Sequence, residues 1–355
     1  MDLYAVVMAG GVGARFWPKS REKYPKQLLK IFDDHTLIQA TVQRLEGMVD
    51  NDKILIVTNK LHKEEIIKQL PQILPENIIE EPFGRNTAAC IGLASIVIEK
   101  KSKDAVSVIL PADHIIKEKD IFQNTIKKAV EYAHRSKGLI TIGIPPTRPE
   151  TGYGYIQIDD RNVEDNIFKV YTFAEKPNFT TAVRFIESGD FMWNSGMFIW
   201  RVDTILDEFK LYMPELNQGL QKLKQFVDTP DFEKEVLNAY GQFRNISIDY
   251  GIMEKSKRVY LTKGVFTWSD VGSWEEVYQL SNKNKDRNAI NGPAYTDMAF
   301  DSYIYSPDKF TAVIGLDNII VINTDDALLI CRRDQAQEVK KVVEHLKLKK
   351  LNNYL

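Results

Sequence analysis

Cysteine is scarce in this sequence, and the long hydrophobic runs of membrane proteins are missing. Only two cysteines, Cys90 and Cys331, occur among the 355 residues, and neither has a CxxC neighbour. Their apolar surroundings favour free core thiols over a disulfide, as is usual in a reducing compartment. The start, MDLYAVVMAGG, has an apolar run far too short to span a bilayer and no basic leader. We therefore expect a soluble protein of the cytoplasm.

An excess of charge of one sign is also absent. The net charge is −2 and the pI is near 6.3, so no overall positive field would attract nucleic acid or an anionic membrane. Hydrophobic residues make up 44% and charged residues 27%, the balance of an ordinary globular protein. Any phosphate-binding site must therefore come from a local concentration of lysine and arginine. We expect no nucleic-acid and no membrane partner.

Several well-known catalytic motifs are missing as well. The histidines show no HExxH spacing and there is no GxSxG elbow, which disfavours zinc and serine hydrolases. The P-loop motif GxxxxGK[ST] is absent. A GxGxxG dinucleotide fingerprint fails because Phe16 stands three residues after Gly13, although Asp33 follows at about the spacing of the ribose-binding acid.

What the chain does have is an alternation of short apolar runs and amphipathic stretches through its first half. Thr36 and Gln39, for example, form a predicted capping box ahead of an amphipathic stretch. The alternation predicts an α/β fold with a doubly wound, mostly parallel, Rossmann-like sheet, whose ligands bind beyond the carboxyl ends of the strands. The predicted buried strands are residues 3–9, 54–58, 78–80, 106–110 and 139–144.

The pattern changes toward the end of the chain. The segment 281–293 is rich in turn-forming residues, and short strands and one final helix follow it. We predict a catalytic domain of residues 1–284 and a small β-rich domain of residues 285–355. The apolar stripe of the last helix is expected to dock on the protein rather than on a membrane.

The segment after the first predicted strand, residues 8–28, combines glycines with cations. Gly10, Gly11 and Gly13 allow backbone N–H groups to approach a phosphate closely. The segment is predicted to bind an anion as large as a triphosphate, with a solvated surface turn as the alternative. Its cations, opposed by Glu22 alone, are Arg15, Lys19, Arg21, Lys23 and Lys26.

Two further motifs supply isolated carboxylates. LPADH places Asp113 at the carboxyl end of a predicted strand, where it could coordinate Mg²⁺ beside a polyphosphate or, equally, cap a helix. In WSDVGSW the capping role falls to Ser273 with Glu276, so Asp270 is expected to be available for other work. Because Mg²⁺ takes one or two protein carboxylates plus phosphate oxygens, the two aspartates fit a magnesium site.

Another set of polar residues suits a small hydroxylated ligand. The motif AEKP follows a predicted strand over 168–173, and its proline makes Glu175 and Lys176 project from a stiff position. A lysine charge suits a sugar phosphate and a glutamate accepts from hydroxyls, although a plain surface turn fits about as well. TGYGYI (151–156) and NSGMF (194–198) add turn glycines and an amide.

The motif EEPFGRNTAA precedes a predicted helix over 87–100, which Asn86 can cap. Arg85 there faces the positive end of the helix dipole, an unfavourable place for a cation unless an anion or an acid joins it. Glu80 and Glu81 could accept hydrogen bonds from a base that carries N–H donors, as the edge of guanine does.

Together these motifs resemble those of the mannose-1-phosphate guanylyltransferases (GDP-mannose pyrophosphorylases) of the sugar nucleotidyltransferase superfamily. GGxGxRxxPxS…PKQ, PxxRNTA, LPADH, TGYGYI, EKP, NSGMF and WxDVGSW occur in order from Gly10 to Trp274, about three-quarters of the chain. The resemblance implies transfer of GMP from GTP to α-D-mannose 1-phosphate, giving GDP-mannose and diphosphate, with Mg²⁺ as cofactor. It also implies a small β-helical C-terminal domain and a homodimer.

The resemblance assigns roles to individual residues. The residues implied in catalysis are Arg15, Lys26, Lys176, Asp113 and Asp270. Asp113 and Asp270 would bind Mg²⁺, and Arg15 and Lys26 would bind the triphosphate. Those implied near the nucleotide are Gly10, Gly11, Gly13, Glu81, Arg85, Asn86 and Thr87. Those implied on the sugar side are Gly154, Glu175, Lys176 and Asn194.

Two alternatives share much of this pattern. A nucleotidyltransferase for another hexose or heptose 1-phosphate would have the same catalytic residues. A non-catalytic paralogue that binds the sugar nucleotide and regulates a partner should have lost a metal ligand or the cationic loop. This chain retains Asp113, Asp270 and the cations between Arg15 and Lys26.

Overall fold

The computed structural model describes residues 1–11 and 13–355, whose contacts group the chain into two compact units. The chain passes from unit 1 to unit 2 shortly after the strands that end at Ala9 and Pro111. Unit 1 contains Met1–Gly10, Thr41–Ala112 and Ile116–Trp268, and unit 2 contains Gly11–Ala40, Asp113–Ile115 and Ser269–Leu355.

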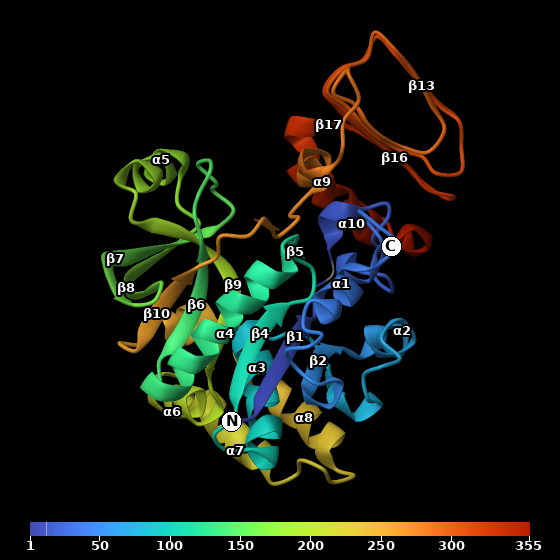
Figure 1. Cartoon of the computed structure of the whole chain (residues 1–355). Coiled ribbons are helices and arrows are strands. Elements are labelled where there is room, and N and C mark those ends of the chain that lie inside the picture. The colour runs from blue at the N-terminus through green and yellow to red at the C-terminus, as the bar shows by residue number, and fades with distance from the viewer. Residues whose placement is uncertain (12) are drawn as a thin grey trace. The chain divides into compact units, whose positions relative to one another are not determined.

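A nine-stranded sheet with the order β3-β2-β1-β4-β9-β6-β10-β8-β7 forms the centre of unit 1 (Figure 1). All the strands predicted from apolar runs are present, and their bounds differ from the predicted ones by at most one residue. The strands are β1 (Leu3–Ala9), β2 (Ile54–Asn59), β3 (Ile78–Glu81), β4 (Val106–Pro111), β6 (Leu139–Ile144), β7 (Gly154–Glu164), β8 (Ile167–Glu175), β9 (Phe191–Arg201) and β10 (Val259–Lys263).

The predicted fold class is confirmed, but the sheet is mixed. β3, β2, β1 and β4 are parallel neighbours, as in a Rossmann-like fold, and β6 pairs in parallel with β10. β9 is antiparallel to both β4 and β6, and β8 is antiparallel to β7 and β10. Only Asp165 and Asn166, with φ of +37° and +69°, connect β7 to β8. A two-residue connection with two positive φ angles is a tight hairpin, which forces antiparallel pairing.

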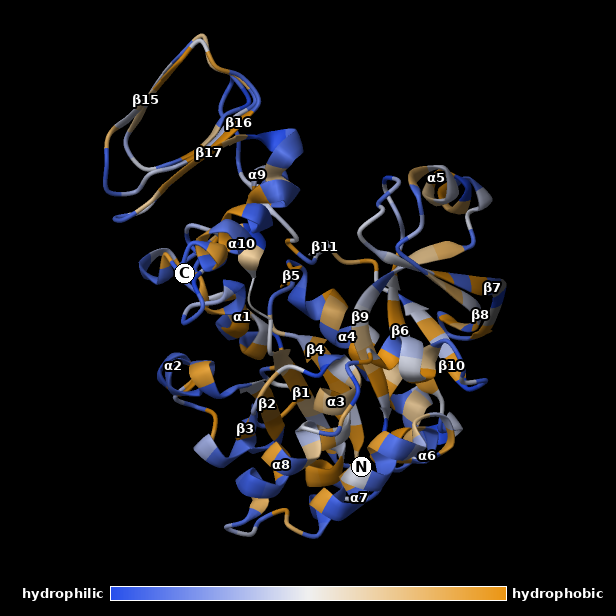
Figure 2. Cartoon of the chain, turned by 180° about the vertical axis from the view of Figure 1, so that it is seen from behind, coloured by the Kyte–Doolittle hydropathy of each residue, from blue (hydrophilic) through white to orange (hydrophobic). Residues whose placement is uncertain are grey.

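Helices cover the two faces of this sheet. α4 (Lys119–Ser136) contacts β4 and β9, while α3 (Asn86–Lys101) contacts β1 and β2 and packs against α6 (Val202–Tyr212) and α7 (Pro214–Lys224) (Figures 1 and 2). Because α3 lies between the sheet and these helices, most of its residues are buried. The other helices of unit 1 are α2 (Lys63–Gln69), α5 (Phe179–Ser188) and α8 (Phe232–Tyr240).

Unit 2 contains strands that stack in successive coils, as predicted for a β-helical part. β12 (Ala289–Asn291), β14 (Tyr303–Tyr305) and β16 (Ile319–Asn323) pair in parallel, and β17 (Leu328–Arg332) joins β16 antiparallel. A second parallel pair consists of β13 (Ala294–Asp297) and β15 (Thr311–Ile314). The helices of this part are α9 (Trp274–Leu280) and α10 (Lys340–Leu348). A further helix, α1 (Leu37–Gln43), begins in unit 2. The chain changes from one unit to the other within the short strands β5 (Ile115–Ile116) and β11 (Trp268–Ser269).

Residues 11–40 belong to unit 2 because their aromatic side chains pack with the C-terminal segments. The ring centroids of Phe16 and Trp274 are 5.0 Å apart, and Trp17 Nε1 donates to the carbonyl of Tyr354 at 2.9 Å. The limits of the compact units therefore differ from the boundary at 284/285, which stays a prediction about the domains.

Both capping boxes are formed: the Thr36 N–H donates to Gln39 at 2.9 Å, and Ser273 exchanges hydrogen bonds with Glu276. Neither cysteine forms a disulfide within the described residues. Among the helices of the same residues, none combines the length and apolar character that a membrane span requires.

Candidate active site

The glycine turn after β1 continues into unit 2 and is shaped around Lys26. Gly13 has a φ of +61°, and a Cβ atom there would lie 2.5 Å from the Cβ atom of Lys26. Glycine is therefore required, both for the left-handed backbone and for the close approach of the lysine. The Gly11 carbonyl accepts a hydrogen bond from Gln27 Nε2 at 2.9 Å. Val12 lies outside the described residues.

Lys26 is the centre of the cationic site. Its side chain is buried, and its ammonium donates to Asp113 Oδ2 at 2.8 Å and to the backbone carbonyl of Asp270. Burial raises the pKa of Asp113, but the charge of Lys26, its hydrogen bond and the neighbouring His114 outweigh burial, so the pKa lies below its ordinary value. The structure thus brings together three residues that were predicted from three separate motifs.

Two of the other loop cations, Arg21 and Lys19, contact the protein, whereas Arg15 is exposed. Arg21 forms an ion pair with Asp326 at 2.7 Å, and Lys19 donates to the Lys30 carbonyl, while burial lowers the pKa of Lys19 to about 8. Both side chains hold unit 2 together, and the anion site expected in this loop stays a prediction. Arg15 is exposed and has no hydrogen bond or ion pair within residues 1–11 and 13–355.

Glu81 is a buried acid at the end of β3 in unit 1. Burial raises its pKa to about 7, and a hydrogen bond from Tyr240 Oη to Oε1, 3.0 Å long, lowers it in part. A Cβ atom on Gly10 would lie 3.3 Å from Glu81 Oε2, so the glycine leaves room for the carboxylate. Glu80 instead forms an ion pair with Lys63 at 2.8 Å. Of the two acids predicted to read a base, only Glu81 is buried beside the glycine turn.

Arg85, Asn86 and Thr87 form the start of α3 and contact the polypeptide itself. Arg85 Nε donates to the carbonyl of Tyr240 at 3.0 Å, which explains how a cation is accommodated there without an anion. The Asn86 side chain accepts from the Thr87 N–H at 2.9 Å, but α3 begins at Asn86 with Arg85 at the N-cap position and without a side-chain capping bond, so Asn86 does not cap the helix as predicted. Thr87 Oγ1 accepts from the N–H of Ile248 at 2.8 Å.

The four residues predicted on the sugar side are neighbours. Gly154 and Glu175 face each other on β7 and β8, because β8 extends two residues beyond the predicted strand end. A Cβ atom on Gly154 would lie 2.5 Å from Glu175 Oε2 and 3.4 Å from Asn194 Cβ. Glu175 Oε1 pairs with Lys176 Nζ at 2.8 Å, and this hydrogen bond raises the pKa of the lysine.

Asp249 completes this set and was not predicted. Its Oδ1 accepts from Asn194 Nδ2 at 2.7 Å, while Asn194 Oδ1 accepts from the Gly196 N–H at 3.1 Å, so the amide is fixed from both ends. Burial raises the pKa of Asp249, and the nearby charge of Glu175 raises it further. The sequence signal was a single acid within the otherwise apolar stretch ISIDYGIM. Tyr240, the partner of Glu81, was also missed.

Asp113 and Asp270 are the residues of unit 2 that fit a divalent metal. Carboxylate oxygens are the ligands that Mg²⁺ prefers, and Lys26 contacts both residues. No group of three or more His, Cys, Asp or Glu side chains suited to an ion is found within residues 1–11 and 13–355. Phosphate oxygens of a substrate would therefore have to supply further ligands.

Parallel strands followed by a glycine turn are typical of nucleotide-binding α/β folds. The family described as Nucleotidyl transferase matches residues 4–287, and the chain belongs to this family. A second family, the MannoseP isomerase/GMP-like beta-helix domain, matches residues 299–346.

The names of individual relatives are more specific than that of the family. The chain is 38% identical to mannose-1-phosphate guanylyltransferase of Escherichia coli over 355 residues, which is 98% of this chain and 76% of the relative. It is 37% identical to mannose-1-phosphate guanylyltransferase RfbM of Salmonella typhimurium LT2, over 100% of this chain and 74% of the relative. A crystal structure from Thermus thermophilus, described as mannose-1-phosphate geranyltransferase, matches with a TM-score of 0.89 and 31% identity and covers 98% of this chain and 100% of that one.

The buried carboxyl of Glu81 predicts a stability that falls with rising pH. Its pKa of about 7 in the folded chain lies above the ordinary 4.5, so the folded state retains the proton that the unfolded state loses. Stability from this group is complete below pH 4.5 and is lost as pH rises through 7, by about 3 kcal/mol. Glu81→Gln should remove this loss, measured as the free energy of unfolding in urea between pH 4.5 and 8.

The control is Glu80→Gln, on the same strand but with its carboxylate paired to Lys63. It should retain the pH dependence of the wild type. Parallel curves for the wild type and Glu81→Gln across this pH range would contradict the account of Glu81.

Proposed function

We propose that this chain is a cytoplasmic mannose-1-phosphate guanylyltransferase, which transfers GMP from GTP to α-D-mannose 1-phosphate and yields GDP-mannose and diphosphate. The observation that carries the proposal is the buried Lys26 held between Asp113 and Asp270, in a chain whose relatives bear that name along nearly its whole length. Such a cluster has the charges that phosphoryl chemistry needs.

The reaction is a single displacement at phosphorus. An oxygen of the mannose phosphate forms a bond to the α-phosphorus of GTP, and the bond from that phosphorus to the bridging oxygen of the β-phosphate breaks. Diphosphate leaves with the electron pair. Because no covalent enzyme intermediate is needed, the protein contributes binding, orientation and stabilisation of developing charge.

The triphosphate of GTP is assigned to the glycine turn and its cations. Within the described residues no hydrogen bond engages the N–H groups of Gly11 and Gly13, which are therefore available to phosphate oxygens. Arg15 is exposed and can extend to the same anion. Lys26 has a compact charge that offsets the negative charge on the phosphates. Asp113 and Asp270 would hold Mg²⁺, which when bound neutralises charge on phosphate oxygens.

The base is assigned to Glu81 beside Gly10. An ionised Glu81 can accept from two N–H donors at once, and the edge of guanine offers two. Tyr240 Oη contacts Oε1 of this carboxylate, and Oε2 faces Gly10. Arg85, Asn86 and Thr87 act by holding the start of α3 in place, since their side-chain hydrogen bonds are with backbone groups.

The sugar phosphate is assigned to the cluster of Gly154, Glu175, Lys176 and Asn194. Lys176 supplies one charge for one phosphate, and Glu175 with the Asn194 amide supplies hydrogen-bonding groups for sugar hydroxyls. Gly154 keeps space open, because any larger residue would collide with Glu175. Asp249 fixes the orientation of the Asn194 amide.

Replacing either metal-binding candidate should lower turnover and leave the fold intact. Asp113→Asn and Asp270→Asn are each expected to lose about 10²-fold or more in kcat, the usual effect of removing a group that stabilises charge in the transition state. Diphosphate release at saturating substrates, followed over a range of Mg²⁺ concentrations, measures the loss. Asp34→Asn, an exposed aspartate of the same unit, is the control and should remain fully active.

One variant should also affect stability. Lys26 is buried and contacts the carboxylate of Asp113, so Asp113→Asn should lower the Tm because the ammonium loses a charged partner. Near-normal turnover of either variant at saturating Mg²⁺ would remove that residue from the metal site.

The two lysines should affect different substrates. Lys176→Ala should mainly raise the KM for mannose 1-phosphate, and Lys26→Ala should mainly weaken GTP binding and lower kcat. A charge-assisted hydrogen bond to phosphate contributes about 1.5–3 kcal/mol, which corresponds to roughly 10- to 150-fold in affinity. Steady-state kinetics with each substrate varied decide the matter, with Lys30→Ala, an exposed lysine of unit 2, as the control. If Lys176→Ala weakened GTP and left mannose 1-phosphate unaffected, the two assignments would be wrong.

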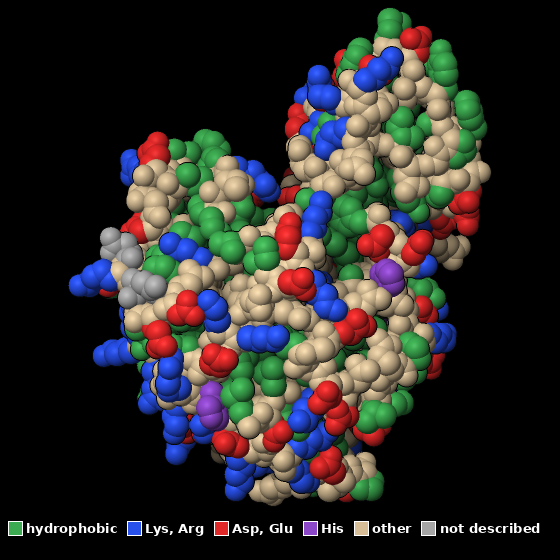
Figure 3. All heavy atoms as spheres, in the orientation of Figure 1, with side chains coloured by type: hydrophobic (Ala, Val, Ile, Leu, Met, Phe, Trp, Pro, Cys, Tyr) green, Lys and Arg blue, Asp and Glu red, His purple; other side chains and the backbone are tan. Residues whose placement is uncertain are grey.

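We further infer a homodimer formed through the β-helical part of unit 2. β17 is the last strand of its sheet, and its outward residues Leu328 and Ile330 are 54% and 60% exposed. Figure 3 shows hydrophobic side chains on the surface of this part. An open edge with exposed apolar residues is typical of an association surface. Light scattering should give a dimer for the full chain and a monomer for Ile330→Asp; a monomeric wild type at micromolar concentration would refute the inference.

A further inference from the structure

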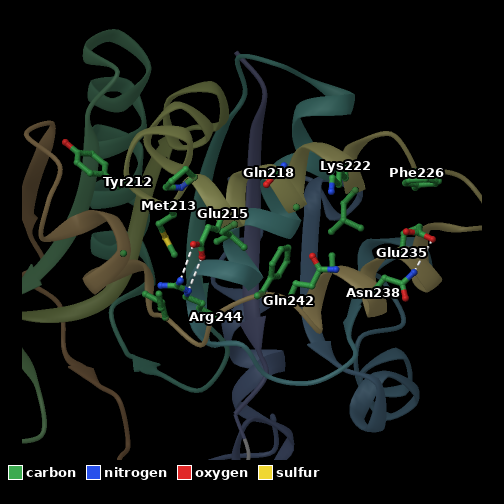
Figure 4. Close-up of a pocket in the computed structure, with 18 of the residues that line it drawn as sticks. Tyr212, Met213, Glu215, Gln218, Lys222, Phe226, Glu235, Asn238, Gln242 and Arg244 are labelled. Carbon is green, nitrogen blue, oxygen red and sulfur yellow. Dashed lines mark hydrogen bonds and ion pairs between the residues drawn. The ribbon is translucent and has the colours of Figure 1, made fainter.

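A pocket of about 700 Å³ lies in unit 1 between α7, α8 and the residues that follow α8 (Figure 4). Its volume falls within the range of small-molecule sites. None of the residues assigned above to GTP or to the sugar phosphate lines it. Apolar and aromatic side chains form much of its wall, among them Leu216, Leu223, Phe226 and Phe243.

The polar groups of the pocket fall into two kinds. Glu215 with Arg244, and Glu235 with Asn238, already satisfy each other across hydrogen bonds of 3.1 and 3.2 Å (Figure 4). In contrast, no hydrogen bond or ion pair within the described residues engages the side chains that are available to a ligand. They include Gln218 and Lys222 on α7 and Gln242 across the pocket.

The lining indicates the chemistry of the ligand. The lining has three positive charges, from Lys222, Arg244 and Lys255, and two negative charges, from Glu215 and Glu235. The charge of Lys222 has no ion pair within the described residues and lies beside the apolar wall. Phe226 and Phe243 are part of the lining, and aromatic side chains favour contact with a flat ring. A planar aromatic or heterocyclic compound with a single negative charge, a carboxylate or a sulfonate, matches these features.

Residues 240–249 line one side of the pocket and also contact the residues assigned above to the substrates. This segment supplies Gln242, Phe243 and Ile246 to the pocket. The same segment contributes three contacts to the site: Tyr240 to Glu81 at 3.0 Å, Ile248 to Thr87 at 2.8 Å and Asp249 to Asn194 at 2.7 Å. A ligand that favours one position of this segment must therefore change the affinity of the site for its substrates.

We propose that this pocket is a second, regulatory binding site that takes a planar aromatic monoanion and is coupled to substrate binding through residues 240–249. The claim that a ligand binds in this pocket does not depend on the proposed function. The claim that this binding is coupled to substrate binding rests on the proposed assignment of Asn194 to mannose 1-phosphate.

Binding is tested with 8-anilinonaphthalene-1-sulfonate, a fluorescent aromatic monoanion, titrated into the full-length protein. Lys222→Glu should raise its Kd about two- to tenfold, as expected for reversing one exposed charge. Gln218→Trp, which fills the pocket, should abolish this binding phase. Lys234→Glu, an exposed lysine of α8 that does not line the pocket, is the matched control and should bind as the wild type does. Circular dichroism and Tm confirm that each variant is folded.

Coupling is tested in the same titration with saturating mannose 1-phosphate. The substrate should change the Kd of the dye by about fivefold or more in the wild type, and the dye should change the Kd of the substrate by the same factor. Equal dye affinity in the wild type, Lys222→Glu and Gln218→Trp would overturn the pocket assignment. Loss of dye binding in those variants together with no effect of the substrate would overturn the coupling. Because dye binding needs no turnover, an inactive enzyme would count against the proposed function alone.

Discussion

The charge of Lys26 cannot stay buried without partners, because an unpaired ion removed from water costs several kcal/mol. The lysine obtains them from Asp113 and from the backbone of Asp270, which lie far apart in the sequence. One ammonium therefore fixes the glycine turn, the end of the LPADH motif and the loop before α9 in one place. Gly13 is part of the same constraint, since any side chain there would displace the lysine. The catalytic candidates of unit 2 depend on this arrangement.

In unit 1 the side chains that are held in place by their neighbours are carboxylates. Glu81 and Glu175 each face a glycine, Gly10 and Gly154, where a Cβ atom would crowd the carboxylate oxygen. The end of α8 and the residues after it hold Glu81 and Asn194 from another side: Tyr240 donates to Glu81, and Asp249 accepts from Asn194. Acids placed next to backbone in this way are suited to accept hydrogen bonds from a ligand without the cost of reorientation.

Local patterns explain what could be predicted. Apolar runs indicated the strands, and closely spaced glycines indicated the turn that the structure forms around Lys26, since both signals lie within short windows. The missed features depend on packing between distant segments. Nothing near Lys19 or Arg21 in the sequence indicates that Lys30 and Asp326 hold them. Asp249 stood out only as a lone acid among apolar residues, and its partner lies 55 residues away.

The central claim is that this chain joins GTP to mannose 1-phosphate. Diphosphate release tests it most directly, measured first for each of the common nucleoside triphosphates with mannose 1-phosphate and then for GTP with a panel of hexose and heptose 1-phosphates. Each pair is assayed with and without Mg²⁺. The account predicts the highest kcat/KM for GTP with mannose 1-phosphate, and only in the presence of the metal. No release from that pair, or faster release with another base or another sugar 1-phosphate, would contradict it.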